Sequence, residues 1–74
     1  MSKLPKISGK ECIKALSKTG FYFKRQQGSH IILRHDNPFA QLVVPNHKEL
    51  DRGLLRRLLR DADLTVEEFV ALKK

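Results

Sequence analysis

The sequence of 74 residues predicts an α+β fold in which one helix precedes three strands and two helices follow them. Apolar residues recur at helical spacing near the start of the chain and again in its C-terminal third. Between these regions, three β-prone runs are separated by short turns that contain Gly, Asn or Pro. Strands joined by turns this short pair in antiparallel order, so a three-stranded antiparallel sheet is expected.

The first helix is expected over about residues 8–18. The four residues SGKE at 8–11 fit a capping box, in which the hydroxyl of Ser8 accepts from the amide of Glu11 and the carboxylate of Glu11 accepts from the amide of Ser8. Apolar residues follow at helical spacing. Gly20 is expected to end this segment, because glycine tolerates the positive φ that is common just past a helix.

The three strands are expected in the runs FYFKRQQ, SHIILRH and AQLVVP. Gly28 lies in the turn between the first two runs, and Asn37 and Pro38 lie in the turn between the second and the third. The third run ends at Pro45, which has no amide hydrogen to donate to a neighbouring strand.

Two helices are expected after the strands. The first follows Asp51, a favourable N-cap, and carries a leucine-rich stripe on one side and arginines on another. The second, at about 66–73, follows a capping box formed by Thr65 and Glu68. Stacking the amphipathic helices on one face of the sheet buries their apolar sides and leaves the other face open. This is the α-β-β-β-α(-α) arrangement of double-stranded-RNA-binding domains, here as one domain over residues 1–74.

The positive charge of the chain is concentrated in its first half. Residues 1–35 contain eight basic residues and one acid, whereas residues 36–74 contain seven of each, so the whole net charge of +7 lies before residue 36. A small basic domain favours polyanionic partners such as RNA, because binding phosphates releases counterions. Solubility is the alternative explanation of the same charge.

Several classes of protein do not fit the sequence. A single cysteine, Cys12, excludes a disulfide framework, and the Cys and His spacings are not those of a zinc site. The sequence has neither a signal-peptide pattern nor an apolar run of the roughly 18 residues that a membrane span needs. A cytoplasmic protein without membrane association is therefore expected.

The second strand raises a question about its first residue, His30. Side chains alternate along a strand, so His30 and Arg34 share one face while Ile31 and Leu33 share the other. The two adjacent aliphatic residues make the second face the better candidate for the core. His30 and Arg34 are therefore expected on the open face of the sheet.

The neighbouring strand is expected to follow the same alternation. Phe21 and Phe23 are expected in the core, which turns Tyr22 and Lys24 outward, with Arg25 near the turn. The open face would then be a cationic surface that contains the imidazole of His30.

The histidines do not form a predicted metal site. His30 and His35 are five residues apart on a strand and so face opposite ways, and His47 lies in a different loop. His35 and His47 are expected to be surface residues. No metal and no other cofactor is expected.

One histidine on a cationic surface suits RNA cleavage. RNA carries its own nucleophile, the 2′-hydroxyl, so cleavage needs a group that accepts or donates a proton and a cation that stabilises charge on the phosphorus. The unperturbed pKa of histidine lies near the operating pH, so His30 fits the first role, and Lys24 or Arg34 could fill the second. A surface residue at the start of a strand is the alternative for His30.

The order of motifs resembles the HicA toxin family, also called YcfA-like. A Gly-Phe pair follows the first helix, Gly-Ser-His precedes an aliphatic strand, and "VVPNHKEL" and "DRGLLRRLLRDADLTVEEF" follow. The resemblance runs from about Lys6 to Leu72. One departure is at Leu54, because many relatives have Thr or Ser directly after the glycine that corresponds to Gly53.

The resemblance implies a function. HicA proteins are small ribonuclease toxins of bacterial toxin–antitoxin systems that cleave mRNA and arrest translation, and a HicB antitoxin covers their active site. It implies that His30 is the catalytic residue, with Gly28 and Ser29 in the two motif positions before it. The residues expected to contact the RNA backbone are Lys24, Arg25 and Arg34 and, further along the surface, Lys10 and Lys48.

Two other functions fit the same sequence. One is a non-catalytic RNA-binding module on the same fold, and the other is a protein that only sequesters an antitoxin. The arginines of the leucine-rich helix are expected to be solvated or to face the antitoxin rather than to take part in catalysis; they are Arg52, Arg56, Arg57 and Arg60.

Overall fold

The computed structural model describes residues 3–73, so residues 1, 2 and 74 of the predicted domain lie outside it. Its elements follow the predicted order: α1 (Gly9–Ser17), β1 (Tyr22–Gln27), β2 (His30–Asp36), β3 (Phe39–Pro45), α2 (Arg52–Asp61) and α3 (Val66–Leu72).

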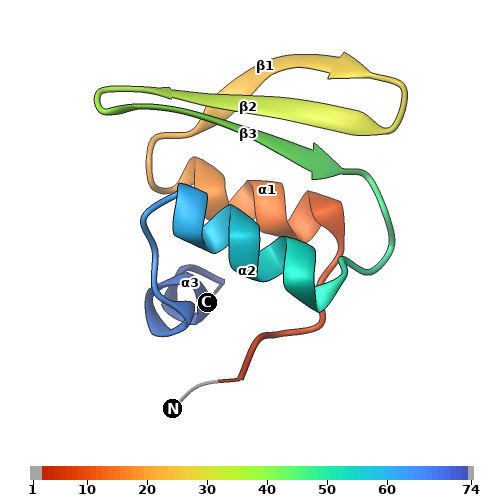
Figure 1. The fold of residues 1–74 in the computed structure, drawn as a ribbon, viewed down its shortest axis with the longest axis vertical. Coiled ribbons are helices and arrows are strands. Elements are labelled where there is room, and N and C mark those ends of the chain that lie inside the picture. The colour runs from red at the N-terminus through yellow and green to blue at the C-terminus, as the bar shows by residue number, and fades with distance from the viewer. Residues whose placement is uncertain (1–2, 74) are drawn as a thin grey trace.

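The strands form one antiparallel sheet in the order β1-β2-β3. Helices α1 and α2 both lie on one face of this sheet and contact β3, and α3 packs against both of them (Figure 1). The predicted α+β architecture with a three-stranded open sheet is therefore confirmed. None of the helices within residues 3–73 is long and apolar enough to cross a bilayer.

Local capping fixes where each helix begins. The hydroxyl of Ser8 accepts from the amide of Glu11 at 3.1 Å, and the carboxylate of Glu11 accepts from the amide of Ser8 at 3.0 Å. This capping box also lowers the pKa of Glu11, because the hydrogen bond from the amide of Ser8 favours the ionised carboxylate. Thr65 and Glu68 form the same box at α3, and Asp51 caps α2. Caps of this kind each contribute about 1 kcal/mol.

Alternation along the strands separates a buried face from an open one. On β3, Leu42 and Val44 are buried, whereas Val43 between them is 45% exposed. Ile31 and Leu33, their partners on β2, belong to the same core cluster as the buried residues of the three helices. The predicted parity of β2 is confirmed by this cluster, which excludes Ile32, although Ile32 is itself only 3% exposed.

Cys12 lies fully buried in the core. Burial raises the pKa of its thiol to about 12, because the thiolate would lose its hydration there. This cysteine is therefore a small apolar core residue rather than a reactive group.

The prediction that Phe23 lies in the core is wrong. Phe21 is buried, but Phe23 is 59% exposed, and the other residues of β1 are exposed too. A β-bulge interrupts the ladder between Phe23 and Arg25, and β1 is an edge strand lying beyond the helices (Figure 1). The side chain therefore has no helix to pack against.

His35 is not the surface residue that was expected. Its ring is half-buried, lies 5.3 Å from the ring of Phe21, and has Nδ1 2.9 Å from the carbonyl oxygen of Pro38. Gly20 has a φ of +99°, and a Cβ there would lie 2.8 Å from Nε2 of His35. His35 is thus a structural residue that joins the β2–β3 turn to the segment after α1.

Candidate functional site

His30 opens β2 directly after the turn formed by Gly28 and Ser29. Its side chain is exposed, and its backbone is flanked by Gln27 on β1 and Pro45 on β3. Gly28 has a φ of +59°, a left-handed conformation in which glycine avoids the strain of a Cβ. The role predicted for Gly28 as a turn residue therefore agrees with the backbone geometry.

The turn before His30 is tied to the loop after β3. The amide of Asn46 donates to the carbonyl oxygen of Ser29 at 2.6 Å. In the same loop, the carbonyl oxygen of His47 accepts from the amide of Gly9 at 2.9 Å. Three segments that are distant in sequence therefore meet at the His30 end of the sheet.

Close packing of α1 against β3 reinforces this meeting point. A Cβ at Gly9 would fall well inside contact distance of the carbonyl oxygen of Pro45, so only glycine fits. Two of the predicted RNA-contacting residues, Lys10 at the start of α1 and Lys48 in the loop after β3, are exposed close to this point in the chain. The fold thus brings both lysines to the end of the molecule that holds His30.

The side chain of His30 lines a groove of about 370 Å³ between the sheet and α2. Five of its lining residues are leucine, valine or proline, and the other four have polar side chains. The lining residues are His30, Gln41, Leu42, Val43, Pro45, Leu54, Arg57, Leu58 and Asp61. His30 therefore faces a concave surface built by three different elements rather than a flat sheet.

Arg57 is the basic residue of this groove that the sequence did not predict there. It was expected to be solvated or to face an antitoxin, yet it lines the groove together with His30. A signal for it exists in the sequence: Leu54, Arg57, Leu58 and Asp61 follow one another at steps of three, one and three, which places them on one side of a helix. Their common side could not be connected to His30 without knowing how α2 packs.

The predicted RNA-contacting residues of β1 are placed differently from expectation. Arg25, not Lys24, stands opposite Ile32 in the ladder and so shares the face of His30. Lys24 is the extra residue of the bulge, which removes it from the simple alternation that predicted its direction. Both side chains are exposed on the strand beside His30.

Arg34 does not lie close to His30. Four residues along a strand correspond to about 13 Å. The guanidinium of Arg34 also has other contacts: Nη2 donates to Oε1 of Gln41 at 3.3 Å, and its carbon lies 5.5 Å from the centre of the Phe39 ring. Arg34 therefore belongs to the opposite end of the open face and is not placed to serve the same phosphate as His30.

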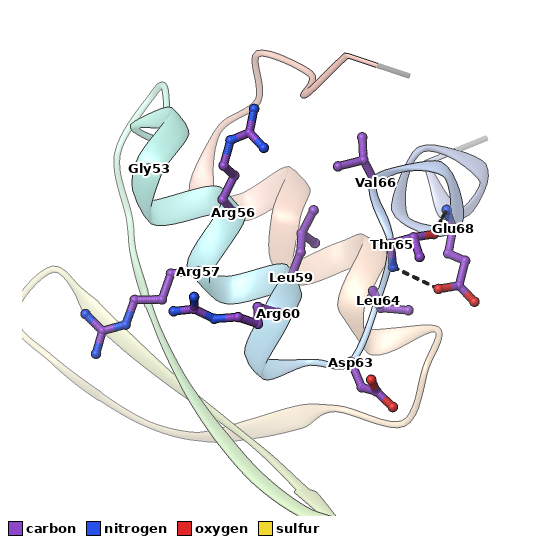
Figure 2. A pocket seen from close by; sticks show the side chains of 10 residues that line it. All are labelled: Gly53, Arg56, Arg57, Leu59, Arg60, Asp63, Leu64, Thr65, Val66 and Glu68. Atoms are coloured by element: carbon purple, nitrogen blue, oxygen red, sulfur yellow. Dashed lines mark hydrogen bonds between the residues drawn. The ribbon is translucent and has the colours of Figure 1, made fainter. Parts of the chain in front are cut away.

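A second, larger groove of about 730 Å³ separates α2 from the start of α3. Arginines line it above an apolar floor of Leu59, Leu64 and Val66 (Figure 2). Its Glu68 is already held by the capping box with Thr65. This groove offers positive charge, but its lining includes no histidine that could exchange a proton near neutral pH.

Comparison with protein families identifies the chain. Residues 9–64, most of its length, match the family model described as HicA toxin of bacterial toxin–antitoxin. The chain belongs to the HicA toxin family. Comparison with curated proteins gives no match. The resemblance predicted from the sequence motifs is therefore confirmed, and the protein is a toxin-family member of a bacterial toxin–antitoxin system.

The one departure from the usual HicA pattern lies inside the His30 groove. Leu54, where many HicA relatives were expected to carry a hydroxyl, lines this groove together with His30 and Leu58. The side of α2 that faces His30 is consequently more apolar in this chain than a Thr or Ser would make it.

The described residues do not bring metal ligands together. Within residues 3–73, no group of three or more His, Cys, Asp or Glu side chains is arranged to hold a metal ion. The three histidines lie in three settings: His30 in the groove, His35 packed on Phe21, and His47 exposed in the loop after β3.

Proposed function

We propose that this HicA-family protein is a metal-independent endoribonuclease that cleaves mRNA and so arrests translation, with His30 as its general acid or base. One observation carries the proposal: His30 is exposed at the rim of a groove, and its side chain has no hydrogen-bond partner among the described residues. A histidine that is not occupied structurally is free to exchange a proton with a bound substrate.

The reaction needs only the RNA and the protein. The 2′-oxygen attacks the adjacent phosphorus, a new bond from phosphorus to the 2′-oxygen forms, and the bond from phosphorus to the 5′-oxygen breaks. The 2′-hydroxyl loses a proton and the 5′-oxygen gains one, and His30 serves one of these transfers. Basic side chains near the reacting phosphate stabilise its added negative charge.

The supporting charges come from the same end of the molecule. Arg25 shares the face of His30, and Lys24 is exposed next to it in the bulge. Lys10 and Lys48 stand on the segments that meet behind the Ser29 turn. We assign these four residues to contacts with the RNA backbone, whereas Arg34 acts farther along the open face.

The partners follow from the family. A toxin of this kind requires an antitoxin, and we propose a HicB-type antitoxin that covers the His30 groove. Because the substrate is mRNA, the site of action is the cytoplasm.

Expression of the wild type and of His30→Ala tests the proposal. We expect the wild type to stop growth and degrade mRNA, and His30→Ala to do neither. The purified wild type should cleave RNA in the presence of EDTA and leave an all-2′-deoxy oligonucleotide intact. Cleavage and toxicity retained in His30→Ala would exclude His30 as the catalyst. Salt-sensitive RNA binding without any cleavage by the wild type would instead favour a non-catalytic RNA-binding module.

A further inference from the structure

The His30 groove has the chemical character of a nucleotide site. Its volume of about 370 Å³ lies within the range of small-ligand sites. Its floor is apolar, since Leu42 and Leu58 are buried beneath it. Its polar groups are Gln41, Arg57 and Asp61 in addition to His30. Apolar surface suits the face of a base or a ribose, and amide and carboxylate groups suit the edge of a base.

Arg57 is the cation of this groove. Its guanidinium makes no hydrogen bond or ion pair with other residues in the part of the chain that the structure describes. Figure 2 shows Arg57 extending from α2 toward the strands, whereas Arg56, the preceding residue, points away from them. A planar guanidinium with several donors matches the oxygens of a phosphate.

The other arginines are less suited to this role. Arg34 is engaged with Gln41 and Phe39. Arg56 and Arg60 line the groove between α2 and α3 but not the groove of His30. Arg57 lines both grooves, so it is the arginine that shares a groove with His30.

We propose that the groove between β3 and α2 holds one unpaired nucleotide of RNA at the cleavage point, with Arg57 as the ligand of its phosphate. This inference rests on the proposed ribonuclease function and adds the substrate's state and a contact residue to it. A base stacked and paired in a duplex cannot enter a concave site of this size, whereas an unstacked base of a single strand can.

The first experiment separates binding from cleavage. In a His30→Ala background, which leaves RNA uncut, we expect Arg57→Gln to weaken binding of a single-stranded RNA about tenfold and to reduce the magnitude of the salt slope by about 0.7. In the otherwise wild-type protein, Arg57→Gln should lower kcat/KM for cleavage about 100-fold, and Arg57→Lys should recover part of this loss.

Arg56→Gln is the matched control, because it removes the same charge from the neighbouring position outside the His30 groove. We expect it to change binding and cleavage less than threefold. Equal losses for Arg56→Gln and Arg57→Gln would overturn the proposal in favour of a general effect of net charge. Unchanged RNA binding and cleavage in Arg57→Gln would overturn it as well. The role of His30 is tested separately by His30→Ala.

The second experiment compares an RNA as a single strand with the same RNA annealed to its complement. We expect cleavage of the single strand and at least a tenfold lower rate for the duplex. Equal rates would overturn the unpaired substrate. If the wild type cleaves neither the single strand nor the duplex, the ribonuclease function is rejected. The RNA-binding measurements with Arg57→Gln would still test the groove. If Arg57→Gln weakens only binding of the antitoxin and leaves RNA binding intact, the groove is a protein contact and the proposal fails.

Discussion

The two ends of β2 carry similar residues and use them differently. At the Asp36 end, His35 packs on Phe21 and contacts Pro38, and Tyr22 donates to Asp36 at 2.8 Å. At the other end, His30 has no hydrogen-bond partner for its side chain within residues 3–73 and faces a groove. A histidine that already has partners stabilises the fold, and a histidine without partners is available to a substrate.

The largest effect should separate these two histidines by activity. We expect His30→Ala to lower the rate of RNA cleavage by about 10²–10⁴-fold, the usual contribution of a general acid or base. His35→Ala should keep the cleavage rate of the folded protein within twofold but lower the free energy of unfolding by about 1–2 kcal/mol. Rates of cleavage and urea unfolding of both variants provide the check. A loss of cleavage in a folded His35→Ala would contradict the distinction.

The next effect concerns the packing behind His30. Gly9→Ala places a methyl group against the carbonyl oxygen of Pro45, and neither backbone segment can move without disturbing the other. We expect a loss of about 3 kcal/mol in the free energy of unfolding. Because α1 and β3 must separate, the cleavage rate of the remaining folded protein should fall too. Urea unfolding and cleavage assays check both parts, and a variant as stable as the wild type would show that the approach is not tight.

A smaller effect is expected from the corresponding glycine at the other end. Gly20→Ala forces alanine into a φ of +99° and against the ring of His35. We expect a loss of about 1–2 kcal/mol with no change in cleavage by the folded protein. His35→Ala removes the ring that the new methyl group would contact. The double variant should therefore lose less stability than the sum of the losses in the two single variants. Full additivity in urea unfolding would show that the ring does not contribute.

The smallest effect is a change in the titration of Tyr22, which reports on the Asp36 end of β2 alone. The pKa of Tyr22 is raised because its hydroxyl donates to the carboxylate of Asp36, whose negative charge also opposes the phenolate. Asp36→Ala should therefore lower the titration midpoint toward the usual value of about 10. The chain has one Tyr and no Trp, so ultraviolet absorbance follows Tyr22 without interference. The same midpoint in both proteins would contradict the hydrogen bond.

Much of the fold was predictable because its determinants are local. Ser8, Asp51 and Thr65 cap their helices as expected, since each cap depends on residues three positions apart. The parity of β2 was predictable because Ile31 and Leu33 identify its buried face. The same alternation predicted His30 on the opposite face of β2, but it did not reveal that His30 lines a groove together with α2.

The errors arose where the determinants are not local. A bulge after Phe23 changes the faces of Lys24 and Arg25 relative to β2, and the alternation of residue types does not reveal one extra residue. The part that Arg57 plays in the groove depends on how α2 packs against β3, which a helical pattern by itself does not specify. The candidate site was therefore only half visible: its histidine could be found from the sequence, and its groove could not.

The construction of the His30 groove has a consequence for protein synthesis. Its lining extends from His30 to Asp61, so a chain still growing on the ribosome lacks one wall of the groove until residues 52–61 have been made and have folded. Until then, the strand that carries His30 has no opposite wall for a substrate to rest on. The proposed cleavage, which depends on this groove, can therefore begin only once α2 has folded against β3.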